Sequence, residues 1–175
     1  LVQSKLGLPI YLHESDDAQT GFLVEAWKCG IVIEIGPVGQ GLFNSRIISQ
    51  TQLVLESCLE QIKLVENKDA FFPDKLIVHR HIKSIDFPRD SKGFINGYVH
   101  PFRQSKDWHP LNINDELFLT SEGKTIKFQE KETFIPVFIN EAAYMEKNIA
   151  MSLTKREVWE FKSEWKKSLF EFVQK

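Results

Sequence analysis

The apolar positions follow one pattern in the first third of the chain. Residues 31–35 form a β-branched run that is interrupted once and does not alternate, which predicts a strand buried on both faces, as in a parallel sheet. A shorter strand is predicted at 8–13. Asn44 or Ser45 can cap a helix over 47–68. One stripe of this helix is predicted to be buried against the sheet: Ile48, Leu55, Leu59 and Ile62.

A different period begins after 67–74, a polar stretch with an aromatic pair and a proline that marks the boundary between two domains. Short strands are predicted over 76–87, 95–100, 116–120, 124–128 and 134–139. Turn-forming residues connect them, without helices between. Strands at this spacing predict an antiparallel β domain, a small barrel or sandwich.

The last stretch, 154–175, is predicted to be an amphipathic helix. Its apolar stripe consists of Val158, Phe161, Trp165, Leu169 and Phe172. The opposite face mixes Lys with Glu, so we expect the stripe to dock on the chain itself or on a sister subunit in a homodimer, and not on a membrane. The fold class is therefore α/β followed by all-β, with domains at 1–69 and 70–153 and a helix at 154–175.

Composition narrows the classes of partner and compartment. The chain has 175 residues, 42% of them apolar, and can bury one sizeable core. A formal net charge of -2, with acids and bases interspersed, is not typical of nucleic-acid or membrane binding. Cys29 and Cys58 lack C-x-x-C spacing, which favours a reducing cytoplasm. The start at Leu1, without Met, suggests a segment of a longer protein.

Glu34 is the residue whose position most needs a reason. It interrupts the apolar run just before Gly36 and Pro37, which end the predicted strand. A carboxylate in a buried strand loses hydration worth several kcal/mol unless it is paired. One interpretation is a general acid or base at the mouth of the sheet, where ligands bind in open α/β folds. The other is a charge that faces outward at a sheet edge or caps a neighbouring turn.

Three other groups of polar residues each allow a functional and a structural interpretation. The acidic stretch 14–20 is better explained as a solvated loop than as a metal site, since no His follows at ligand spacing. His79 and His81 lie two apart in a predicted strand and could share an ion, but no third ligand stands nearby. Tyr144 follows the last predicted strand, where its phenol could donate to a substrate or simply pack with its hydroxyl satisfied.

Taken in order, several motifs resemble those of the aspartoacylase family of zinc-dependent amidohydrolases. They are IEIGPVGQG (33–41), DFPRDSKG (86–93), HP (100–101), DWHPL (107–111), LFLTSEGKTI (117–126) and PVFINEAAYMEK (136–147). The resemblance spans roughly residues 30–150. It implies the carboxyl-terminal part of a zinc-carboxypeptidase-like α/β domain, followed by a channel-forming antiparallel β domain.

The resemblance also implies roles for two residues. Glu34 matches the family's general base and proton shuttle, and Tyr144 matches the tyrosine that contacts the bound N-acyl amino acid. The family's Zn²⁺ ligands lie upstream of these motifs, so no metal ligand is expected in this segment. We expect the segment to be inactive alone and the full-length protein to hydrolyse the amide of an N-acyl amino acid.

The substrate is open at this stage. Family members close to the mammalian enzymes carry a Tyr and an Arg shortly before the glutamate, but here 21–29 reads GFLVEAWKC, with Lys28 its only base. N-acetyl-aspartate is therefore one candidate among other N-acyl amino acids, including the N-succinyl amino acids that desuccinylases cleave. The alternative from another class is a non-catalytic binding or assembly module.

Overall fold

The computed structural model describes residues 1–13, 24, 29–39 and 41–174. The acidic stretch 14–20 and Lys28 lie outside these described residues. The described residues fall into two compact units. The first comprises those of Leu1–Ile10, Ser15–Ile77 and Val158–Lys175, and the second those of Tyr11–Glu14 and Val78–Glu157. We call the second the β unit.

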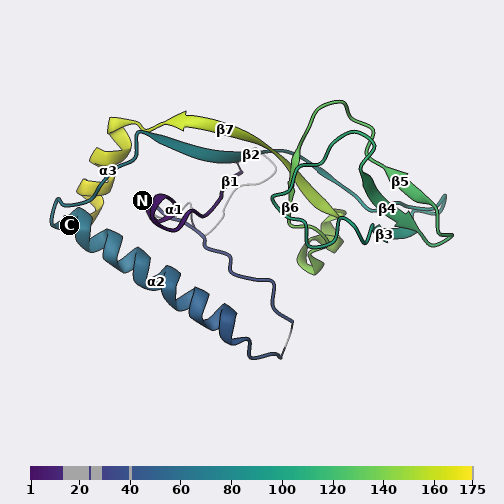
Figure 1. The fold of residues 1–175 in the computed structure, drawn as a ribbon, viewed down its shortest axis with the longest axis horizontal. Coiled ribbons are helices and arrows are strands. Elements are labelled where there is room, and N and C mark those ends of the chain that lie inside the picture. The colour runs from purple at the N-terminus through teal and green to yellow at the C-terminus, as the bar shows by residue number, and fades with distance from the viewer. Residues whose placement is uncertain (14–23, 25–28, 40, 175) are drawn as a thin grey trace. The chain divides into compact units, whose positions relative to one another are not determined.

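The described residues form two sheets (Figure 1). One is four-stranded, in the order β1-β2-β7-β6, from Ile10–Leu12, Lys75–Ile85, Met151–Glu160 and Ile135–Val137 respectively. The other has the order β3-β4-β5, from Gly97–Val99, Glu116–Thr120 and Thr125–Lys127, and both of its pairings are antiparallel. The strands predicted in the second half of the chain are thus present, with shifted ends.

The core of the β unit lies where these strands and their connections meet. Its buried members are Phe87, Val99, Leu111, Leu117, Phe118, Phe128, Phe134, Ile139, Ala150, Met151 and Leu153. Strand β6 pairs antiparallel with β7, with Pro136 opposite Leu153. Residues 151–154 are buried at four successive positions, so both faces of β7 are covered there.

The prediction of a helix over 154–175 is wrong in its first part. Residues 151–160 form β7, and helix α3 spans only Ser163–Val173. From Lys155 to Glu160 the exposure alternates along the chain, as in a strand with one covered face. Val158 and Phe161 therefore do not share a helical stripe with Trp165, because the helical spacing was coincidental.

The first unit contains three helices among its described residues: α1 (Val2–Leu6), α2 (Ser45–Glu66) and α3. Asn44 caps α2 as predicted, since its side-chain oxygen accepts from the backbone N–H of Arg46 and Ile47. Lys5 of α1 forms an ion pair with Glu60 of α2. None of the described helices is both long and apolar enough to cross a membrane.

The predicted burial of the α2 stripe is wrong. Its four residues are 48–59% exposed: Ile48, Leu55, Leu59 and Ile62. The buried positions of α2 are instead Val54, Ser57 and Val65. The buried face of the helix is therefore not the predicted stripe, and the described residues leave that stripe exposed. Helical spacing identifies a face, but burial also needs a neighbouring layer to cover that face.

The predicted buried strand at 31–35 is also wrong in this structure. Residues 30–39 have no regular secondary structure, and Ile31 and Val32 are 64% and 67% exposed. A buried strand requires partners for its backbone groups and layers on both faces. No described strand pairs with this segment. Glu34 is consequently exposed, and the desolvation argument for it does not apply here.

His79, in β2, is the buried histidine of the β unit with a perturbed titration. Its side chain packs edge-to-face against Trp108, at 5.0 Å between ring centroids. It is 8% exposed, and its Nδ1 has no hydrogen-bond partner among the described residues. Burial, and secondarily the positive charge of Arg156, lowers the pKa of His79. The folded state therefore holds this imidazole neutral.

We expect the stability of the protein to fall with acidification because of His79. Below an unfolded pKa of 6.5 the unfolded chain binds a proton that the folded state excludes until lower pH. The free energy of unfolding is not reduced by His79 above pH 6.5. It decreases as the pH falls from 6.5 through the lower pKa that His79 has in the folded state. His79→Phe should flatten the decline by at most one proton, about 1.4 kcal/mol per pH unit. Denaturant unfolding between about pH 5 and 8 measures this.

The matched control is Phe94→Leu, at an exposed position of the same unit. The change involves no titratable group, so its pH dependence should follow that of the wild type. A His79→Phe variant with an unchanged pH slope would contradict the assignment to His79.

Candidate functional site

The strongest candidate site in the β unit is the segment around Tyr144. A short 3₁₀ helix, η2, spans Ala142–Lys147 and ends at Asn148, whose φ of 59° is left-handed. Tyr144 lies in this helix, and its ring contacts the ring of Phe138 at 5.5 Å between centroids. Lys147 Nζ lies 5.7 Å from the centroid of the Tyr144 ring. A helix this short needs contacts outside itself to stay in place.

Arg89, in the DFPRDSKG motif, fixes the end of η2. Its Nη2 donates to Asn148 Oδ1 at 2.7 Å, across 59 residues of sequence. Asp86 of the same motif orients the guanidinium by accepting from Arg89 Nε at 2.6 Å. The hydrogen bond from Arg89 lowers the pKa of Asp86, because it favours the ionised carboxylate. Arg89 therefore has a persistent partner on one side and Asn148 on the other.

Asp107, in the DWHPL motif, fixes the approach to η2. Its Oδ1 accepts from the backbone N–H of Ile139 at 3.2 Å. Asn140, which has a left-handed φ of 60°, donates from its backbone N–H to Ala150 O at 2.8 Å and from Nδ2 to Gln104 Oε1 at 3.3 Å. The segment with Tyr144 is thus bound to the 107–111 motif at Ile139, before η2, and to the 86–93 motif at Asn148, directly after η2. Three motifs that lie apart in the sequence converge on the segment that carries Tyr144.

The two histidines that the sequence paired have different surroundings. His79 faces Trp108, whereas His81 Nδ1 lies 3.2 Å from Tyr11 Oη, and the His81 ring lies 4.8 Å from that of His13. The described parts of the chain contain no group of three or more His, Cys, Asp or Glu side chains that could hold a metal ion. The residues described here therefore do not fit a zinc site.

Glu34 belongs to the first unit, in the exposed segment before Gly36. Within the described ranges, no side chain forms an ion pair or a hydrogen bond with its carboxylate. Tyr144 belongs to the β unit. Glu34 and Tyr144 thus belong to different units, and each is described within its own unit. A site that contains both residues is proposed only for the full-length protein.

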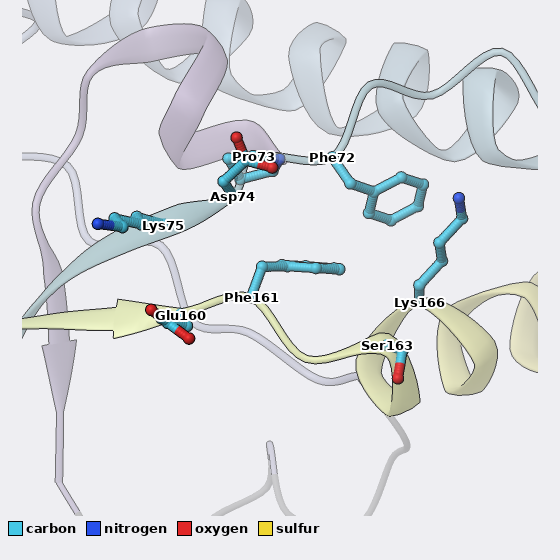
Figure 2. A pocket seen from close by; sticks show the side chains of 8 residues that line it. All are labelled: Phe72, Pro73, Asp74, Lys75, Glu160, Phe161, Ser163 and Lys166. Carbon is cyan, nitrogen blue, oxygen red and sulfur yellow. The ribbon is translucent and has the colours of Figure 1, made fainter.

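A cavity of about 460 Å³ lies elsewhere, in the first unit (Figure 2). Its lining comes from the start of β2, the end of β7 and the start of α3: Phe72, Pro73, Asp74, Lys75, Glu160, Phe161, Ser163 and Lys166. The rings of Phe72 and Phe161 already pack on each other at 5.3 Å, and Lys166 Nζ lies 5.0 Å from the Phe72 centroid. None of the predicted site residues lines it.

Sequence reasoning missed the residues that hold the Tyr144 segment, namely Arg89, Asp107 and Phe138. One signal was available in the sequence. Arg89 and Asp107 lie in two of the motifs that carry the resemblance, although no role was predicted for either residue. An Asp in a loop, or an Arg that follows a proline, can form hydrogen bonds with several neighbouring residues. The sequence therefore does not indicate that either residue has a distant partner. Their partners become evident only from the folded chain.

Comparison with known proteins identifies the same regions. Residues 74–156 match the model of the AstE/AspA barrel-sandwich hybrid domain. A probable aspartoacylase of Prochlorococcus marinus (strain NATL1A) is 67% identical over 173 residues, which are 99% of this chain and 57% of that protein. A probable aspartoacylase of the MIT 9313 strain of the same species is 51% identical over 173 residues, again 99% of this chain and 57% of that protein.

Solved structures agree. A crystal structure of a mutant murine aminoacylase 3 superimposes with a TM-score of 0.82 at 30% identity, over 90% of this chain and 53% of that one. A second murine aminoacylase 3 structure gives 0.73 at 28% identity, with the same coverage of both chains. The chain thus spans a little over half the length of these relatives, and the predicted fold class of α/β followed by all-β is confirmed. The chain belongs to the aspartoacylase family and corresponds to the carboxyl-terminal part of its members.

Proposed function

We propose that this chain forms the carboxyl-terminal part of an amidohydrolase that cleaves N-acyl amino acids, with Glu34 as general base and Tyr144 as a substrate-binding residue. The observation that carries the proposal is the convergence on Tyr144. Arg89 and Asp107 hold the two sides of the segment around a tyrosine whose ring is already packed. Contacts of this kind on both sides of a short helix are expected where one side chain must be positioned accurately.

Exposed apolar side chains in the first unit also support the proposal. The exposed stripe of α2 and the exposed run at 31–35 together present apolar side chains along a 22-residue helix and the segment that precedes it. Surfaces of this kind are normally covered. The relatives are much longer than this chain, so the full-length protein has additional residues available as cover. Such cover would remove the apolar side chains of both segments from water.

In the proposed reaction, Glu34 accepts a proton from the water that attacks the amide carbonyl and passes it to the leaving amine. A carboxylate within hydrogen-bond reach of the water can serve both steps. Tyr144 donates a hydrogen bond to the substrate, and the β unit forms a wall of the channel. Zinc enters the proposal only as a group held by residues outside this chain. Homodimerisation and a cytoplasmic location stay predictions.

The first test concerns the chain by itself. We expect the 175-residue chain not to hydrolyse N-acyl amino acids and to bind no stoichiometric zinc, because the proposed ligands are in the remainder of the full-length protein. Metal analysis after purification and an amine-release assay measure both. One tightly held zinc per chain would contradict this placement of the ligands. A full-length protein without upstream His and Glu ligands would instead favour a binding or assembly module.

The second test concerns Glu34. In the full-length protein, Glu34→Gln should lower kcat by at least about 100-fold, the usual loss for a positioned acid-base group. Zinc content should stay at the wild-type level because Glu34 is not proposed as a ligand. The matched control is Glu122→Gln, in the exposed turn after β4, which should leave kcat unchanged. Near-normal turnover, or loss of metal, in Glu34→Gln would refute the assignment.

The third test concerns Tyr144 and the substrate class. Tyr144→Phe removes one donor without changing the shape of the ring. The lost hydrogen bond is worth about 0.5–1.5 kcal/mol, or roughly 3 kcal/mol if the acceptor is charged. We therefore expect kcat/KM to fall about 3-fold to 100-fold. N-acetyl-aspartate, an N-acetyl aromatic amino acid and N-succinyl-glutamate are to be compared.

A contact to the substrate's side-chain carboxylate would penalise the two acidic substrates most. The control is Tyr98→Phe, on the exposed side of β3, which should leave all three substrates unaffected. Equal and negligible effects of Tyr144→Phe on all three would mean that Tyr144 only packs.

A further inference from the structure

Tyr144 belongs to a row of aromatic rings within the β unit. Its ring packs on Phe138, and Phe138 meets Tyr11 edge-to-face, at 5.1 Å between centroids and 88° between planes. Phe138 follows β6 directly, and Tyr11 is the middle residue of β1. Edge-to-face contact is a preferred geometry for aromatic pairs. The row therefore connects the η2 helix to two strands of the four-stranded sheet.

Phe138 has an unusual backbone conformation. Its φ is +56°, in the left-handed region that bulky residues rarely adopt. Such a conformation persists only where neighbouring structure imposes it. The next residue, Ile139, is buried and donates its backbone N–H to Asp107 Oδ1. The chain therefore accepts a strained backbone at 138, and the result is that the Phe138 ring lies between Tyr11 and Tyr144.

Tyr11, the other neighbour of Phe138 in this row, is also held in place. Tyr11 Oη lies at hydrogen-bond distance, 3.2 Å, from His81 Nδ1 on the neighbouring strand β2. The two rings are close to perpendicular, at 75°, and the His81 ring lies 4.8 Å from that of His13. Tyr11 is thus held at both its ring and its hydroxyl. A ring held in this way gives Phe138 a fixed surface to pack on.

We infer that Phe138 and Tyr11 are positioning residues for Tyr144, and that they set the direction in which its hydroxyl points. The inference rests on the proposed function of Tyr144 as a hydrogen-bond donor to substrate. A hydrogen bond weakens steeply when its donor is misaligned, so a tyrosine that can rotate loses rate even though it is still present. The motif residues Arg89 and Asp107 place the backbone, and the aromatic row orients the ring.

The test is a double-mutant cycle in the full-length protein. Phe138→Leu removes the intermediate ring but keeps an apolar side chain, and we expect kcat/KM to fall about 2-fold to 10-fold, the range of one aromatic pair. In a Tyr144→Phe background the same substitution should have little further effect, because no hydroxyl remains to be oriented. Phe138→Tyr keeps the ring and should restore most of the activity. An equal loss in both backgrounds would overturn the inference.

A measurement that does not depend on activity separates this inference from the proposed function. The full-length protein is labelled with 3-fluorotyrosine, and the Tyr144 signal is identified as the one lost in Tyr144→Phe. Phe138→Leu and Tyr11→Leu should shift that signal, whereas Phe102→Leu, at an exposed phenylalanine of the same unit, should not. If Tyr144→Phe keeps full activity, the proposed function fails, and the fluorine shift alone decides whether the row holds Tyr144. An unmoved Tyr144 signal would overturn positioning.

Discussion

The β unit depends on the burial of the first residues of β7. Met151, Leu153 and Thr154 are fully buried, and the strand pairs with β6 on one side while β2 is its neighbour on the other. Immediately before it, the backbone N–H of Ala150 donates to Ile85 O and its carbonyl accepts from Asn140. Both ends of the 138–150 segment are therefore attached to the core. The placement of Tyr144 follows from this attachment, since η2 is too short to be stable by itself.

Prediction from sequence succeeded where the information is local. The strands around 116–120 and 124–128 are separated by a glycine turn, so pattern and turn chemistry agree. The cap at Asn44 is local in the same sense. At 151–160 the pattern failed, because Val158, Phe161 and Trp165 happen to fit a helical spacing. Strand pairing overrode that spacing: β6 pairs with residues 152–154, and β2 is the neighbour of β7 on its other side. Pairing is a non-local property that one segment does not reveal.

Burial was harder to predict than secondary structure. The stripe of Ile48, Leu55, Leu59 and Ile62 and the run at 31–35 have the composition of covered surfaces, yet both are exposed in this chain. An apolar pattern indicates that a segment is suited to burial. It does not show whether another part of the chain covers that segment. The candidate site shows the same limit. Tyr144 was found through a motif, but its dependence on Arg89 and Asp107 requires contacts across 59 and 32 residues of sequence.

The exposed stripe of α2 also affects how the oligomeric state can be measured. The exposed apolar side chains between Ile48 and Ile62 favour self-association in water, driven by burial of that face between copies. A dimer of the isolated chain would then form through a surface that we propose is covered in the full-length protein. Sedimentation or light scattering on this chain would then detect association through the exposed face of α2. A native subunit interface has to be measured on the full-length protein.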